Sequence, residues 1–379
     1  MSLNIKALLD LFSNTNTSYK FLYFYAIIRI IKKDPLKKSI SFKEIINEML
    51  VLAWLPCFQF NLHFRKQDQI KVILKNLTIN SKPSLKNNKP TNKIINELRH
   101  LIDEALKNDL TLKTLENNLL RYVMVRLVRP FYKRLKKVKE SGKVSMFNMS
   151  KKILEDDYTI ERPPYLIDYT KSKIILNNNW VQYINDHFHF LELWVLDEWH
   201  KYMQYQNKNT PSLYEKLKFP ELKRNSLDKQ RKFWKELILN NDGQIKCIFS
   251  NTILTVNNFD VDHFICWNFL AHDQEWNLIP ILSRVNELKN NKIPDKELIK
   301  PFINFKIKSF KFAKEILTNK KYEEYLAEHS NFINCSSTDC FNPNYKLKYS
   351  EEIILLRNKA KNQGFESFEY LPWETILEN

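Results

Sequence analysis

Residues 260–294 read DVDHFICWNFLAHDQEWNLIPILSRVNELKNNKIP, and this stretch decides how the fold is interpreted. Asp262 and His263 stand next to each other at the end of a short apolar segment that we expect to be a β-strand. Neighbouring side chains on a strand point to opposite faces, so the pair can act together only where the strand ends and the chain bends. An imidazole can take a proton from water near pH 7, and a carboxylate is a hard oxygen ligand suited to Mg²⁺. The pair therefore indicates a hydrolytic site that uses a metal ion.

A short helix is expected after this strand region, with Ser283 as its N-cap and the sequence RVNELKNNK as its body. Within it, Asn286 and Lys289 are three residues apart and share one face. Packing this helix against the strands would bring the Asn286 oxygen towards Asp262, with Lys289 pointing at the anion that a cation holds. An amide, a carboxylate, an imidazole and a positive charge around one cation are what phosphodiester hydrolysis needs.

The combined pattern resembles the HNH (His-Me finger) endonuclease family. The similarity rests on three motifs, which are Asp262-His263, Asn277-Leu278, and Asn286 with Lys289. The segment is similar above all to the HNH domain of RNA-guided CRISPR nucleases, over roughly residues 245–297. The flanking regions only loosely resemble bacterial HNH proteins of unassigned role. The chain is too short to hold the guide-RNA machinery of the CRISPR nucleases.

The resemblance implies a ββα-metal fold and a role for each matched residue. Asp262 and Asn286 would bind one divalent cation, with Mg²⁺ expected and Mn²⁺ or another divalent ion as alternatives. His263 would be the general base, Asn277 would fix the loop that orients it, and Lys289 would sit near the scissile phosphate.

Two departures from the family concern cysteines. Cys266 stands where the family commonly has proline, which bears on the stiffness of the loop rather than on the ligands. Many HNH proteins also have paired CxxC knuckles that bind zinc, whereas Cys247 stands alone here. We therefore expect no structural zinc.

Glycine is rare, with only three residues in 379 against an average usage of about 7%. Hairpins and phosphate-binding loops depend on glycine for backbone conformations with positive φ, so a Gly-rich nucleotide site is excluded. Hydrophobic residues make up 44% of the chain, which is typical of a globular protein. We expect a mainly α-helical fold with one small ββα module.

The formal net charge of +17 favours a polyanionic partner, and nucleic acid is the expected one. Residues 121–143 hold nine basic residues and one acid. The candidate phosphate-binding residues in this basic segment are Arg121, Arg126, Arg129, Lys133, Arg134 and Lys136. The alternative is that Arg126 and Arg129 pair with buried acids while the lysines face water.

Composition and spacing divide the chain into four regions. We expect a basic helical region at 1–155, an aromatic-rich helical region at 156–239, the HNH module at 240–299, and a C-terminal helix with an acidic tail at 300–379. β-branched residues begin to alternate with polar ones after Asn240, so we expect strand structure to begin there.

These observations predict a metal-dependent HNH endonuclease that cuts DNA. Five scattered cysteines indicate a reducing compartment, and no apolar run is long enough to span a bilayer, so a cytoplasmic protein is expected. Bacterial restriction or anti-phage defence is the expected setting, with mobile-element homing as the second. An RNA-cleaving nuclease and a non-cleaving nucleic-acid-binding or assembly protein with a remnant HNH module remain as alternatives. A protein partner or a homo-oligomer also remains open.

Overall fold

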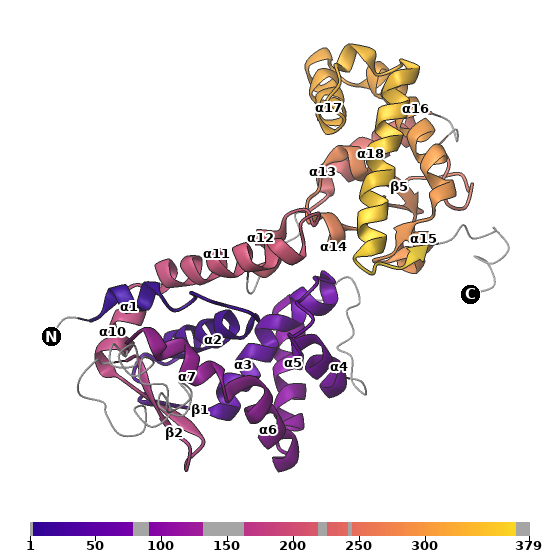
Figure 1. Cartoon of the computed structure of the whole chain (residues 1–379). Coiled ribbons are helices and arrows are strands. Elements are labelled where there is room, and N and C mark those ends of the chain that lie inside the picture. The colour runs from indigo at the N-terminus through magenta and orange to yellow at the C-terminus, as the bar shows by residue number, and fades with distance from the viewer. Residues whose placement is uncertain (1–2, 79–90, 132–162, 219–225, 242–244, 369–379) are drawn as a thin grey trace. The chain divides into compact units, whose positions relative to one another are not determined.

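The computed structural model describes residues 3–78, 91–131, 163–218, 226–241 and 245–368. The protein is mainly α-helical, as predicted, and the chain divides into two compact units (Figure 1). The first consists of Met1–Lys208 with Leu213–Glu221, and the second of Asn209–Ser212 with Leu222–Asn379. The finer division into four regions stays a prediction.

The first unit is built around one buried helix, α2 (Tyr19–Lys33), which packs against α3 (Phe42–Trp54), α7 (Val123–Val128), α10 (Asn178–Asp186) and α11 (Phe188–Gln206). Nearly the whole surface of α2 is covered, as its apolar sequence requires. The remaining helices of this unit are α1 (Ile5–Leu9), η1 (Leu55–Gln59), α4 (Ile70–Thr78), α5 (Thr91–Ala105), α6 (Asp109–Leu115), η2 (Glu116–Leu120), η3 (Arg129–Phe131) and α12 (Leu213–Leu217).

Helix α3 begins where its sequence predicts. The Ser41 hydroxyl accepts from the Glu44 amide, and the Glu44 carboxylate accepts from the Ser41 amide, so that both form a complete capping box. Further along, Glu48 is buried against three cations, Arg29, Lys33 and Arg99. Burial opposes ionisation of Glu48, but the hydrogen bond and the charges from these cations lower its pKa to about 2.

A small antiparallel sheet in the first unit was not expected from helical spacing. Its strand order is β1 (Ser39–Ser41), β3 (Lys173–Leu176) and β2 (Tyr165–Asp168). The β2–β3 segment, YLIDYTKSKIIL, has three consecutive apolar residues in each strand rather than alternating polarity, and each strand is only four residues long. Such short runs fit a helical turn as well as a strand, which is why the spacing alone did not reveal them.

The second unit contains the predicted ββα arrangement. Strands β4 (Phe259–His263) and β5 (Leu278–Leu282) form an antiparallel pair in which His263 lies opposite Leu278, and α15 (Ser283–Lys289) follows β5 directly. The other elements are α13 (Asp228–Leu239), α14 (Trp267–Leu270), η4 (Glu275–Asn277), β6 (Ile293–Pro294), η5 (Lys296–Leu298), α16 (Ile299–Ile316), α17 (Asn319–Phe332), η6 (Ser337–Asp339), α18 (Pro343–Asn362) and β7 (Ser367–Phe368).

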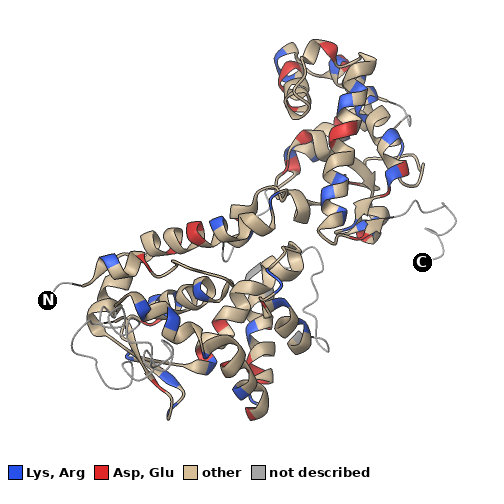
Figure 2. Ribbon diagram, viewed as in Figure 1, with Lys and Arg blue, Asp and Glu red and all other residues tan. Residues whose placement is uncertain are grey.

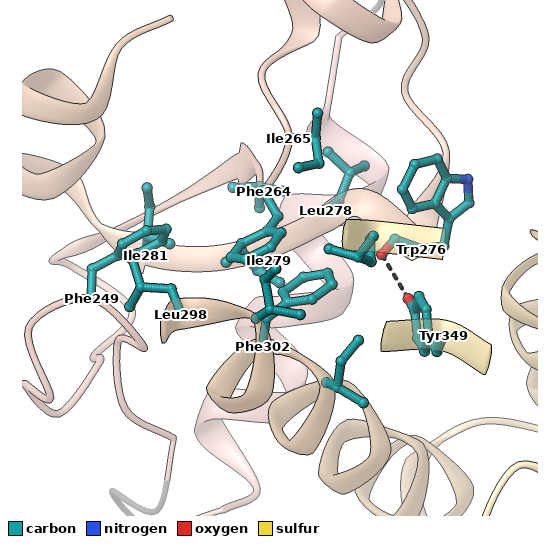
Figure 3. Close-up of a cluster of buried hydrophobic side chains, with 14 of the residues drawn as sticks. Phe249, Phe264, Ile265, Trp276, Leu278, Ile279, Ile281, Leu298, Phe302 and Tyr349 are labelled. Carbon is teal, nitrogen blue, oxygen red and sulfur yellow. Dashed lines mark hydrogen bonds between the residues drawn. The ribbon is translucent and has the colours of Figure 1, made fainter. Parts of the chain in front are cut away.

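The strand pair lies on an aromatic core supplied by the C-terminal helices (Figure 3). The rings of Phe264 and Phe302 stack with centroids 3.8 Å apart, which joins the end of β4 to α16. Where one C-terminal helix was expected after residue 300, the structure has three, α16, α17 and α18. Burial of this core fixes where β4 ends and where the loop after it begins.

Two local expectations were wrong. Between Ile245 and Leu254 the structure has a turn with a single bridge, Lys246 opposite Ile253, rather than a strand. Ser283 is the first residue of α15 and not its cap, because its hydroxyl donates to the Asn258 carbonyl oxygen at 3.3 Å.

No helix in the described part of the chain is long and apolar enough to cross a bilayer.

Candidate metal and phosphodiester site

Strand β4 presents two carboxylates on one face and the histidine on the other. Asp260 and Asp262 are half-buried, whereas Phe259, Val261 and His263 between and beside them are buried. This alternation follows from the two-residue period of a strand. Asp262 and Asp260 therefore face the same neighbour, and that neighbour is α15.

Helix α15 places Asn286 and Lys289 against the two carboxylates, which confirms that the pair share a face. The Asn286 side-chain amide donates from Nδ2 to Asp260 Oδ2 at 3.3 Å. Lys289 donates from Nζ to Asp262 Oδ2 at 2.7 Å and to the His263 carbonyl oxygen at 2.7 Å. The expected approach of Asn286 to Asp262 was thus only partly right, because its hydrogen-bond partner is the carboxylate two residues earlier.

Lys289 is the most deeply placed of these polar groups, with a side chain only 1% exposed. A buried ammonium needs a counter-charge and acceptors, and Asp262 and the His263 carbonyl supply them. Lys289 therefore pairs with the Asp262 carboxylate from the buried side of the site. Its expected position near the scissile phosphate stays a prediction.

The donor set fits a hard divalent cation. Asp262 and Asp260 contribute carboxylate oxygens, and their side chains are 16% and 30% exposed, so an ion from solvent can reach them. Asn286 uses its Nδ2 group towards Asp260, which leaves its amide oxygen as a ligand atom. Among the described residues no group of three or more His, Cys, Asp or Glu side chains could hold a metal ion.

His263 has a carboxylate partner that the sequence did not reveal. Its Nε2 lies 2.9 Å from Asp273 Oδ1, and the side chains are 6% and 14% exposed. An ionised carboxylate can only accept, so in the neutral imidazole Nε2 carries the proton and Nδ1 keeps its lone pair. Asp273 lies ten residues after His263 in the connection between β4 and β5, and no sequence pattern indicated that it returns to the end of β4.

Asn277 is fully buried and ties the two ends of this connection together. Its Oδ1 accepts from the Ile265 amide at 2.8 Å, and its Nδ2 donates to the Ile265 carbonyl oxygen at 2.8 Å. The Asn277 carbonyl oxygen also accepts from the Phe264 amide. A residue that fixes the loop needs these contacts, although its effect on catalysis stays a prediction.

Helices that follow the predicted module also contact the connection between β4 and β5. Lys306 on α16 donates to the carbonyl oxygens of Glu275 and Leu278, one on each side of Asn277. Burial lowers the pKa of Lys306 to about 7, against the opposing charges of Glu275 and Glu328. Burial likewise raises the pKa of Glu275.

Two further contacts fix Trp276, which precedes Asn277. Its ring stacks on Phe332 of α17 with centroids 3.7 Å apart. Its carbonyl oxygen accepts from the Tyr349 hydroxyl of α18 at 2.8 Å (Figure 3). These supports were invisible in the sequence because they connect residues 56 and 73 positions apart.

The basic segment predicted to bind phosphates is only partly described. Arg121, Arg126 and Arg129 are exposed, and Lys133, Arg134 and Lys136 lie outside the described residues. Within the described residues neither Arg126 nor Arg129 forms an ion pair with an acid, so the alternative of buried partners gains no support. Burial and the nearby charges of these two arginines lower the pKa of Lys20 to about 8, which marks a local excess of positive charge. Basic and acidic residues are otherwise mixed over both units (Figure 2).

Comparison with known proteins identifies the segment that contains this site. Residues 246–295 match the family model of HNH endonucleases, and all of the residues named above on β4, β5 and α15 lie within that range. No curated protein and no solved structure matches the chain. This segment of the second unit is therefore similar to HNH endonucleases, which supports a nuclease activity in general.

Proposed function

We propose that this protein is a metal-dependent endonuclease that hydrolyses DNA phosphodiester bonds. One observation carries the proposal. On the facing surfaces of β4 and α15, Asn286 hydrogen-bonds to Asp260 and Lys289 to Asp262, with His263 at the end of the same strand. The match to HNH endonucleases over residues 246–295 supports the same reaction class.

Each side chain has a task in this reaction. His263 accepts a proton from the attacking water at Nδ1, while Asp273 holds the other ring nitrogen. Asp262 and Asn286 hold the cation, with Asp260 beside them, and Lys289 keeps Asp262 in place. A bound Mg²⁺ would supply positive charge next to the phosphate and the leaving oxygen. Asn277 keeps the loop that carries Asp273 closed against the end of β4.

The wider setting is part of the proposal. The expected resemblance of this segment to the HNH domain of RNA-guided CRISPR nucleases is the reason for proposing DNA, and the exposed arginines of the first unit would bind its backbone. We propose a cytoplasmic role in bacterial restriction or anti-phage defence, which fits a nuclease of this size that has a large helical first unit beside its HNH segment.

The test is cleavage of supercoiled plasmid and of an RNA of matching sequence, with Mg²⁺, with Mn²⁺ and with EDTA. We expect cleavage of the plasmid that EDTA abolishes. His263→Ala should lower the rate at least about 100-fold, the usual contribution of a general base. His189→Ala, which changes an exposed histidine on α11 of the other unit, is the matched control.

Two results would contradict the proposal. Cleavage of RNA with intact plasmid would make the substrate RNA. Binding of DNA with no cleavage in either Mg²⁺ or Mn²⁺ would favour the non-cleaving alternative, in which the HNH module is a remnant.

A further inference from the structure

Helix α13 lies next to the site but outside the segment that matches HNH endonucleases. It packs against β4 and α16 through a buried face formed by Trp234, Leu237 and Ile238. Its outward face carries Arg231, Lys232 and Lys235, which are all exposed. At 100° per residue these three side chains fall on one side of the helix.

Arg231 joins this basic face to the strand that holds the candidate metal ligands. Its Nη1 lies 3.1 Å from Asp260 Oδ1, and its Nη2 donates to the Phe259 carbonyl oxygen at 3.0 Å. The guanidinium carbon also lies 5.3 Å from the centroid of the Phe259 ring. These contacts fix the inner edge of the guanidinium while 52% of the side chain stays exposed. A guanidinium has five N–H donors, so donors remain for a ligand from solvent.

The contacts continue from Arg231 to the centre of the site. Asp260 accepts from Arg231 through one oxygen and from Asn286 through the other. Arg231 is thus in direct contact with Asp260 and, through it, two contacts away from Asn286. A phosphate beside the one that is cut would lie within reach of a side chain held at this place.

On α13, Arg231 pairs with Asp260 of β4, whereas the two lysines form no ion pair with the acids of their own helix in the described part of the chain. Asp228 and Glu236 are on the same helix, but within the described residues neither forms an ion pair with Lys232 or Lys235. A surface lysine without a carboxylate partner is available to a phosphate, which releases counterions when it binds.

We propose that the exposed face of α13, formed by Arg231, Lys232 and Lys235, binds the sugar-phosphate backbone of the substrate strand beside the cleavage site. This inference rests on the proposed nuclease function, and it names the surface along which the nucleic acid enters. Arg231 makes the contact nearest to the reaction, and the two lysines extend the path away from it.

The same unit offers a matched control surface. Lys308, Lys311 and Lys314 are exposed on one face of α16, and among the described residues none of them bonds to β4 or α15. They have the same charge and a comparable exposure. If positive charge alone mattered, they would contribute as much as the α13 residues.

The experiment compares two triple variants of the full chain, Arg231→Gln/Lys232→Gln/Lys235→Gln and Lys308→Gln/Lys311→Gln/Lys314→Gln. Binding of a labelled DNA duplex and of a single strand is measured by fluorescence anisotropy in EDTA over a range of salt. We expect the α13 variant to bind roughly tenfold to hundredfold more weakly at about 0.1 M salt. Its log–log salt slope should fall by about 2 to 3, since each lost phosphate contact contributes about 0.9. The α16 variant should bind within about twofold of the wild type.

A second measurement separates Arg231 from the lysines and checks that the fold survives. Arg231→Lys keeps the charge but loses the fork that engages Asp260 and Phe259. In single-turnover cleavage it should lower the rate more than it lowers affinity. Circular dichroism and thermal melting check that each variant is folded. If the α13 triple variant is unfolded, the single variant Arg231→Lys, which keeps the charge, provides the test.

Each contrary outcome has a distinct meaning. Equal weakening by both triple variants, or unchanged binding by the α13 variant, would refute the α13 surface and leave the nuclease proposal intact. A wild type that binds through α13 but does not cleave would refute the nuclease proposal and leave the surface. A wild type that binds neither DNA nor RNA would refute both.

Discussion

At the scale of single residues, the partner of His263 is the feature that most changes the interpretation of the site. The sequence predicted the imidazole and the adjacent Asp262 from their positions at the end of a strand. It did not predict Asp273, because a carboxylate ten residues further along a loop has no period that would place it. Only the closed loop brings its Oδ1 to 2.9 Å from the ring.

Asp273→Ala should lower the turnover number about 100-fold with little change in KM, because the histidine loses the group that selects its tautomer. Side-chain ¹⁵N NMR of histidine-labelled protein, with His263→Ala to assign the signal, should show the two tautomers mixing in the variant. Asp339→Ala, which changes a carboxylate in η6 of the same unit, is the control. An unchanged ring signal with reduced activity would show that Asp273 acts in some other way.

Lys289 is a second residue whose position differs from its expected role. Because it neutralises Asp262 from within, its removal leaves a carboxylate that only a cation can compensate. Lys289→Met should therefore destabilise the protein by about 3 kcal/mol without metal. Mg²⁺ should then raise the melting temperature more in the variant than in the wild type, since a ligand that binds only the folded state stabilises it.

Thermal melting with and without Mg²⁺ checks this prediction. Lys292→Met, three residues beyond Lys289 and partly exposed, is the control. Equal shifts in the wild type and in Lys289→Met would mean that the lysine and the cation do not share Asp262.

At the scale of elements, the sequence was right about β4, β5 and α15 and wrong about their edges. The face shared by Asn286 and Lys289 follows from helical geometry alone, so it could be predicted. The role of Ser283 could not be predicted, because its hydroxyl donates to the carbonyl oxygen of Asn258, 25 residues away, and does not cap its own helix. The turn around Lys246 has the composition of a strand but lacks a neighbour with which to pair beyond one bridge.

The support of η4 by α16 gives a prediction about pH. Lys306 is protonated in the unfolded chain up to its ordinary pKa of 10.5, but burial lowers its pKa in the folded protein to about 7. Between these values the unfolded state binds more protons, so the contribution of Lys306 to the free energy of unfolding rises as pH increases from 7. Lys306→Met should remove this rise. It should also cost about 2–4 kcal/mol, because two buried carbonyl groups lose their donor.

Urea unfolding of the wild type and of Lys306→Met at several pH values from 7 to 9 measures both effects. The difference between the two proteins isolates Lys306 together with the groups that its charge affects, chiefly Glu275. Lys308→Met, an exposed neighbour on α16, should leave the pH dependence unchanged. A constant difference across this range would show that Lys306 does not change its protonation on unfolding.

At the scale of the whole molecule, each compact unit has a buried ionic group that could not be located from the sequence. Composition predicted a mainly helical protein, because three glycines leave little room for hairpins. It could not show that Glu48 would meet three cations from two other helices, α2 and α5, since ion pairs between distant segments leave no local pattern.

Glu48→Gln should destabilise the first unit by about 3 kcal/mol near neutral pH, because Arg29 and Arg99 then lack a counter-charge. The pKa of Glu48 is lowered from 4.5 to about 2, so its stabilising contribution is present above 4.5 and is lost as the pH falls towards 2. The difference in free energy of unfolding between the wild type and Glu48→Gln should therefore become smaller as the pH falls from 4.5 towards 2.

Hydrogen exchange of peptides from α2 and α3 at pH 6 and at pH 3 provides the measurement. Peptides from α16 to α18 in the second unit are the internal control and should exchange equally in both proteins. A deficit of the same size at both pH values would show that Glu48 is not ionised in the folded protein.

The stack of Trp276 on Phe332 carries a consequence for inheritance. The loop that orients the general base borrows its rigidity from side chains whose codons lie well downstream of the nuclease motif. Loss-of-function alleles should therefore arise at Phe332 and Tyr349 as well as at the acids of the cleavage centre. A recombination event that exchanged residues 246–295 alone would deliver the reactive groups into a setting that no longer aims them.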